Sequence, residues 1–122
     1  MKAHLVAGAF CTLLLAGCAS SQYRPVVDTG VSRGNYEDDV ADCQHLSDQR
    51  PAAAQAAGGA VAGAVIGALI GAAVGLHGDD VAEIAAWGAV EGGASGAAYG
   101  IDEQRSIVSR CMEGRGYAVI AD

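Results

Sequence analysis

Residues 56–76 have the sequence AAGGAVAGAVIGALIGAAVGL, an uncharged stretch in which a glycine returns at every fourth position. A second stretch with the same spacing follows it. Glycine costs about 1 kcal/mol relative to alanine inside a helix, so both rows need an offsetting contact. Small residues four apart share a helix face, where they let two backbones approach closely. The sequence therefore predicts a glycine zipper, with helix-packing residues Gly59, Gly63, Gly67, Gly71, Gly75, Gly88, Gly92, Gly96 and Gly100.

The two rows are separated by the polar segment HGDD at 77–80. This segment has the length and polarity of a turn between antiparallel helices, so we expect a helical hairpin over residues 56–101. The first row would be about 31 Å long as a helix, which matches the hydrocarbon core of a bilayer. In the second row Glu83, Trp87 and Glu91 form a polar and aromatic stripe beside the glycines.

A carboxylate near mid-bilayer is costly and usually faces protein or water. Glu91 therefore leaves three arrangements open. The hairpin can span the membrane with Glu91 turned inward, or its second helix can lie in the interface with Trp87 as an anchor. The third arrangement is a soluble hairpin that does not enter the membrane.

Shorter elements are predicted on both sides of the hairpin. Asn35 precedes three acidic residues and a helical apolar pattern, which is typical of a helix N-terminus, and Pro51 ends that helix. Residues 102–112 are again helical, and residues 117–120 form a short strand that could pair with residues 26–27. The predicted fold is mostly α: a glycine-zipper antiparallel hairpin flanked by two short helices, with a short terminal two-stranded β pairing.

The N-terminus has the features of a secretory signal peptide, with Lys2 before an apolar run at 5–16 and small residues after it. The segment Leu15-Ala16-Gly17-Cys18 resembles the lipobox of bacterial lipoproteins. That resemblance implies cleavage before Cys18 and acylation of this residue, and two acyl chains already anchor a protein stably. A plain signal peptide cut near residues 19–21 is the alternative. The predicted organisation is a signal peptide at 1–17, the lipidated cysteine and a tether at 18–34, and one small helical domain at 35–122.

The cysteine count predicts a disulfide in the mature chain. Of the four cysteines, Cys11 leaves with the signal peptide and Cys18 carries the lipid, so Cys43 and Cys111 remain. Disulfides persist in exported proteins, and we expect these two to be bonded. Two free, buried thiols are the alternative.

Composition and charge argue against several classes of function. The net charge of −7 becomes −8 when Lys2 is removed, which leaves no electrostatic footprint for nucleic acid. His45 would point about 200° away from Cys43 on a helix, so a Cys–His catalytic pair is not expected. We predict no enzyme activity and no catalytic residue, cofactor, metal site or small-molecule substrate.

Taken together, the segments YRPVVD at 23–28, Asp42-Cys43, the zipper and RCMEGRGYAVI at 110–120 resemble the glycine-zipper lipoproteins of Gram-negative bacteria. The chain is broadly similar to the outer-membrane group that includes the seventeen-kilodalton surface antigens. The resemblance implies an outer-membrane lipoprotein, on the periplasmic or surface face, that supports envelope integrity or assembles with itself through its zipper. The alternatives are a pore-forming or effector membrane module with Glu91 in the lumen, and a lipid-tethered periplasmic adaptor that binds a partner helix.

Overall fold

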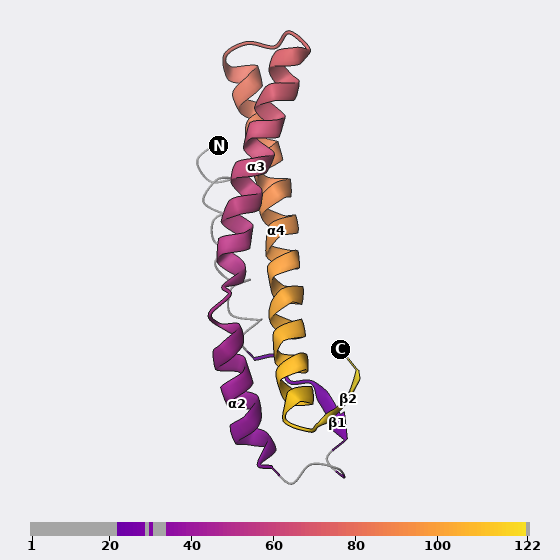
Figure 1. The fold of residues 1–122 in the computed structure, drawn as a ribbon. Helices are drawn as coiled ribbons and strands as arrows, with labels where there is room; N and C mark the ends of the chain where they lie inside the picture. Colours follow the sequence, from indigo (N-terminus) through magenta and orange to yellow (C-terminus); the bar gives the residue numbers. More distant parts are fainter. Residues whose placement is uncertain (1–21, 29, 31–33, 122) are drawn as a thin grey trace, which may run out of the picture. The chain divides into compact units, whose positions relative to one another are not determined.

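The structure is a computed structural model that describes residues 22–28, 30 and 34–121. The predicted signal peptide at 1–17 and the lipidated Cys18 lie outside the described residues. The chain is mostly helical, as expected (Figure 1). Its elements are β1 (Val26–Asp28), α2 (Tyr36–Ser47), α3 (Ala52–Ala73), α4 (Asp79–Gly114) and β2 (Ala118–Ala121).

The chain forms two compact units. Among the described residues, unit 1 combines those up to Arg50 with those from Asp102 onward, and unit 2 is Pro51–Ile101. The domain boundaries given above stay predictions.

The largest difference from the predicted fold concerns the C-terminal helix. Residues 102–112 do not form a separate short helix, because they are the last part of α4, which is 36 residues long. No proline interrupts this stretch. Gly100 lies within α4 and packs against α3, since an added Cβ at Gly100 would lie 2.7 Å from the Cα of Ala52. A glycine in tight contact with a neighbouring helix can therefore stay helical.

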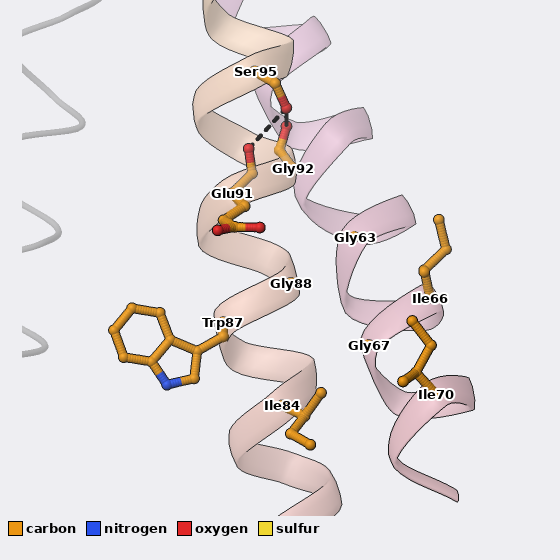
Figure 2. Close-up of a pocket in the computed structure, with 10 residues that line it drawn as sticks. All are labelled: Gly63, Ile66, Gly67, Ile70, Ile84, Trp87, Gly88, Glu91, Gly92 and Ser95. Atoms are coloured by element: carbon orange, nitrogen blue, oxygen red, sulfur yellow. Dashed lines mark hydrogen bonds between the residues drawn. The ribbon is translucent and has the colours of Figure 1, made fainter. Parts of the chain in front are cut away.

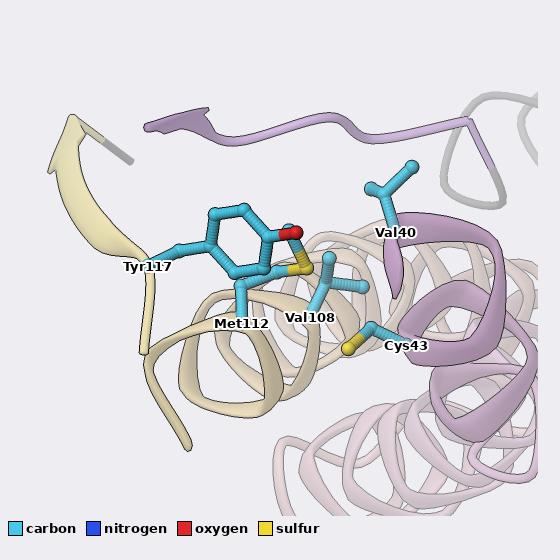
Figure 3. Packing of buried hydrophobic residues seen from close by; sticks show 5 residues of the cluster. All are labelled: Val40, Cys43, Val108, Met112 and Tyr117. Atoms are coloured by element: carbon cyan, nitrogen blue, oxygen red, sulfur yellow. The ribbon is translucent and has the colours of Figure 1, made fainter. Parts of the chain in front are cut away.

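Unit 1 contains a small buried core made by α2, α4 and the segment after α4 (Figure 3). Helix α2 starts as predicted, since the side chain of Asn35 accepts a hydrogen bond from the backbone N–H of Glu37 at 3.3 Å. The helical apolar pattern that follows Asn35 places Val40, Cys43 and Ser47 inside, whereas Leu46 is 47% exposed. The core consists of Val40, Cys43, Val108, Met112 and Tyr117.

The predicted strand pairing is confirmed. Strands β1 and β2 are antiparallel, with Val27 opposite Val119 and an irregularity between Val26 and Val27. The chain reaches β2 through Gly116, which has a φ of 92° after the end of α4. The backbone N–H of Tyr117 donates to the carbonyl of Met112 at 3.1 Å, as in a Schellman motif. This turn directs Tyr117 into the core of unit 1.

Helix α3 in unit 2 ends in the same way. Gly75 has a φ of 85°, and the N–H of Leu76 donates to the carbonyl of Gly71 at 3.0 Å. A Cβ added at Gly75 would find nothing within 4 Å. Gly75 is in phase with the zipper row, but in the structure it ends the helix and does not take part in helix packing. A left-handed C-cap and a packing face both require glycine, so the sequence pattern alone cannot separate the two roles.

Candidate functional site: the glycine-packed helices of unit 2

Helices α3 and α4 meet backbone to backbone in unit 2. A Cβ added at Gly59 would overlap the carbonyl oxygen of Gly92, and one added at Gly92 would overlap that of Gly59. Gly63 and Gly88 are related in the same reciprocal way. No side chain larger than a hydrogen atom fits at these four positions unless the helices separate. This close approach is the offsetting contact that rows of helical glycines require.

The contact continues in both directions from these central pairs. An added Cβ at Gly67 would lie 2.6 Å from the carbonyl oxygen of Ile84, and one at Gly96 would overlap that of Gln55. At Gly71 the nearest atoms, those of Val81, are 3.6 Å away, which is ordinary van der Waals distance. Partners on α4 come earlier in the chain as positions on α3 come later, so the two helices run antiparallel.

Two further glycines lie beside the rows, and sequence reasoning did not assign them a role. A Cβ added at Gly93 would lie 3.4 Å from the Cβ of Ala60, an ordinary contact distance. A Cβ added at Gly58 would find nothing within 4 Å. Gly58 and Gly59 are adjacent in sequence, yet only Gly59 is needed for the contact between the helices.

The bulky side chains of α3 point away from this contact. Because glycine backbone fills the interior of the helix pair, the large apolar residues are on the outside. On α3 they are half or more exposed, as is Val74 at its C-cap: Val61, Val65, Ile66, Leu69 and Ile70. Among the described residues, one stretch, Tyr36–Ala73, which covers α2 and α3, contains a window long and apolar enough to cross a membrane, and only 11% of this window is buried.

One side of the helix pair forms an open groove of about 540 Å³ (Figure 2). Glycines from both helices form its floor. Ile66 and Ile70 stand on the α3 side, while Trp87 and Glu91 stand on the α4 side. The hydroxyl of Ser95 donates to the backbone carbonyl of Glu91 at 2.8 Å, so this hydroxyl does not project toward the carboxylate. The groove is apolar apart from Glu91 and Ser95.

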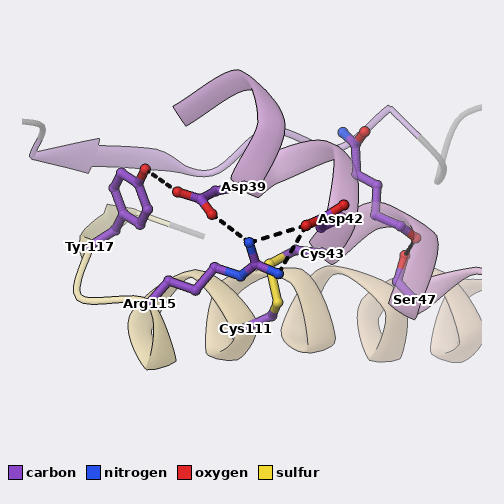
Figure 4. Close-up of a disulfide and its surroundings, with 8 residues drawn as sticks. Asp39, Asp42, Cys43, Ser47, Cys111, Arg115 and Tyr117 are labelled. Carbon is purple, nitrogen blue, oxygen red and sulfur yellow. Dashed lines mark hydrogen bonds and ion pairs between the residues drawn. A yellow bond between two sulfur atoms is a disulfide. The ribbon is translucent and has the colours of Figure 1, made fainter. Parts of the chain in front are cut away.

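The predicted cysteines are brought together in unit 1. Cys43 on α2 and Cys111 on α4 form a disulfide with their Cα atoms 5.7 Å apart. Beside it lies a polar cluster that sequence reasoning did not predict (Figure 4). Arg115 pairs with Asp39 and, at 3.2 Å, with Asp42.

The same cluster includes the aromatic residue that closes the core. The hydroxyl of Tyr117 donates to Asp39 at 2.6 Å. This hydrogen bond, with a smaller contribution from Arg115, holds the pKa of Asp39 below its ordinary value of 3.8. Pairing with the two carboxylates, chiefly Asp39, raises the pKa of Arg115. The cluster links α2 to the turn after α4, which is a structural role.

The lowered pKa of Asp39 predicts acid sensitivity of unit 1. A carboxyl group whose pKa is lower in the folded chain adds stability above its unfolded pKa, and this stability is lost as the pH falls through the folded pKa. We therefore expect wild-type unit 1 to lose stability below a pH of about 4, and Asp39→Asn to flatten this dependence. Urea unfolding followed by tyrosine absorbance over a pH series measures it, with the exposed Asp48→Asn as the control. Equal pH dependence in both variants would contradict this role of Asp39.

The sequence contained an indirect signal for this cluster. Asp39 and Asp42 are three residues apart, on neighbouring positions of one helix surface. Arg115 and Tyr117 are separated by Gly116. What the sequence could not show is that the left-handed turn at Gly116 places both side chains over α2.

Comparison with protein families shows which family the chain matches. A model of the YMGG-like Gly-zipper family matches residues 39–104, which is more than half of the chain. No curated protein and no solved structure matches the chain. The matched region includes all of α3 and both glycine rows. The chain therefore belongs to the YMGG-like Gly-zipper family, and this membership together with the apolar helix α3 indicates a membrane-associated helical protein.

Proposed function

We propose that this protein is a lipid-anchored envelope protein whose hairpin, α3 with the first part of α4, inserts into the outer membrane of a Gram-negative bacterium. Its role is structural, supporting envelope integrity and helix-mediated assembly. The lipid on Cys18 supplies the permanent anchor. The hairpin supplies a second contact with the same bilayer.

The observation that carries the proposal is the distribution of apolar side chains in unit 2. In water, fully burying a valine, leucine or isoleucine side chain gains roughly 1.5–3 kcal/mol over leaving it exposed. Unit 2 leaves Leu69 65% exposed and Val74 68% exposed, while the interior of the helix pair is glycine backbone. Lipid covers such an outer surface without any change in the helix pair.

Apart from Glu83 and Glu91 on α4, the charged and basic groups of the hairpin are compatible with this placement. His77, Asp79 and Asp80 gather in the connecting turn and at the start of α4, at one end of the hairpin. Helix α3 has no charged residue over its 22 residues. On a scale measured by membrane insertion, aspartate at the centre of a helix costs about 2.5–3.5 kcal/mol, so an uncharged α3 avoids this cost.

The experiment is extraction of membranes with alkaline carbonate, using a chain without its lipid. Cys18→Ser behind a plain cleavable signal provides this form. We expect it to stay in the membrane pellet because α3 and α4 hold it there. Adding Leu69→Asp on the lipid-facing side should release most of the protein, whereas adding Leu69→Ile should not.

The opposite result is equally informative. If the lipid-free chain washes off completely, the acyl chains are the anchor and the hairpin does not insert. The exposed apolar surface would then serve contacts with other proteins at the membrane surface. Leakage of ions from vesicles that carry the chain would instead favour the pore-forming alternative, with Glu91→Ala as its control.

A further inference from the structure

The groove on unit 2 combines an apolar lining with one carboxylate. Ile66 and Ile70 are 57% and 55% exposed on one side of it, and Trp87 is 65% exposed on the other. The glycine floor lies low between these walls because it carries no side chains. Such a surface lets a further helix come close, as small residues do between membrane helices.

Glu91 has no counter-ion within unit 2. No hydrogen bond or ion pair of its carboxylate occurs among residues 22–28, 30 and 34–121 of the structure. Residues 51–101 contain no lysine or arginine, and the single basic side chain, His77, lies in the connecting turn. No basic side chain of the same hairpin therefore neutralises the negative charge of the Glu91 carboxylate.

The position of Glu91 along the hairpin makes this lack of a partner costly. At 1.5 Å per residue, Glu91 lies about 18 Å from Asp79 and about 15 Å from Ile101. It is thus near the middle of the hairpin. If the hairpin inserts as proposed above, on which this inference rests, Glu91 lies near the centre of the bilayer, where a carboxylate needs a partner.

We propose that the groove binds an apolar membrane helix of another protein, and that this helix carries one lysine or arginine opposite Glu91. The apolar walls contact the aliphatic side chains of the incoming helix. Its cation pairs with the carboxylate of Glu91, which would otherwise be unpaired in hydrocarbon. The negative charge of Glu91 favours a helix with one positive charge over an uncharged helix.

The other occupants fit this groove less well. A second copy of the hairpin would bring only its own carboxylates to the groove, and like charges at close distance are unfavourable. An acyl chain would fill the apolar part but would offer no charge or hydrogen-bond donor at the depth of Glu91. A second copy as the occupant is an outcome that the following test detects.

Trp87 is the single tryptophan of the chain and lines the groove, so its fluorescence reports on the site. The probes are two synthetic membrane helices of about 20 leucine and alanine residues. One has a central lysine and the other a central methionine, and each carries a quencher one turn from that residue. The full chain, with its lipid, is placed in phosphatidylcholine vesicles with either peptide.

We expect the lysine peptide to quench Trp87 at a concentration lower than the methionine peptide by about tenfold. Glu91→Gln, which keeps the size of the side chain, should abolish this preference. Glu83→Gln should keep it, because Glu83 does not line the groove. Equal quenching by both peptides, or a preference that survives in Glu91→Gln, would overturn the inference.

Brominated lipids separate this inference from the proposed function. If they quench Trp87, the hairpin is in the bilayer, and the peptides alone decide whether the groove selects a cationic helix. If they do not quench Trp87, the hairpin does not insert, and both proposals fail. Quenching that grows with the amount of protein labelled with the same quencher would identify a second copy as the occupant and overturn the inference.

Discussion

Replacing Gly59 by alanine should force α3 and α4 apart, whereas the same replacement at the adjacent Gly58 should stabilise the chain. Both changes improve intrinsic helix propensity by about 1 kcal/mol. They differ in what the new methyl group meets. At Gly58 it finds nothing within 4 Å, while at Gly59 it overlaps the carbonyl oxygen of Gly92, whose carbonyl carbon is 3.0 Å away.

Backbone atoms cannot move aside as a flexible side chain does. A methyl group at Gly59 therefore destabilises the packing of the whole helix pair. Overpacking a close contact typically costs about 1–3 kcal/mol, and a larger side chain costs more. Gly92→Leu should therefore have a still larger effect than Gly59→Ala. The expected order of stability is Gly58→Ala, wild type, Gly59→Ala and then Gly92→Leu.

Thermal unfolding in detergent, followed by circular dichroism, measures this order, and protease resistance of unit 2 provides a second measurement. Gly58→Ala is the matched control because it has the same chemistry one position away. Equal behaviour of the two alanine variants would show that the glycine rows do not pack α3 against α4. Loss of stability in both would indicate that Gly58 faces a partner outside the chain.

Removal of the Cys43–Cys111 disulfide should have the second large effect, and it should fall on unit 1. The bond joins residues 68 positions apart, and closing a loop of this length removes about 4 kcal/mol of unfolded-chain entropy in the simple model. The core that it supports is small, with Val40, Val108 and Met112 as its main aliphatic members. We expect reduction to unfold α2.

Limited proteolysis within α2, with and without reductant, measures this effect, and loss of the tyrosine signal in near-ultraviolet circular dichroism accompanies it. The double variant Cys43→Ser, Cys111→Ser should behave like the reduced wild type and should not respond to reductant. A reduced chain with unchanged protease resistance would contradict a stabilising role for the bond. Unit 2 contains no cysteine, so its protease resistance should not change with reductant and provides the internal reference.

The parts of the fold that could be predicted are those with a strong local signal. Glycines at every fourth position mark two helix faces, and Asn35 marks a helix start that the structure contains. The pairing of residues 26–27 with the strand at 117–120 was predicted as well, although from weaker evidence and without its register. For the glycine rows and the helix start, neighbouring residues determine the local structure, whereas the strand pairing joins segments that are far apart in the chain.

The rest could not be predicted because it depends on contacts between distant segments. Gly75 has the spacing of a packing residue but ends α3, since the choice depends on where the chain turns. Gly100 packs against Ala52 as a zipper residue should, but the continuation of α4 beyond it through residues 102–112 was not predicted. The pairing of Asp39 with Arg115 joins residues 76 positions apart, and no local pattern encodes it.

A periodic contact has one further consequence, which concerns register. Sliding α3 along α4 by one glycine step of four residues, about 6 Å, would again place glycines opposite glycines. The zipper alone therefore allows more than one alignment. The short connection from Ala73 to Asp79, with positive φ values at Gly75 and Gly78, allows only one of them. The length of this turn, and not the glycine pattern, determines which glycines meet.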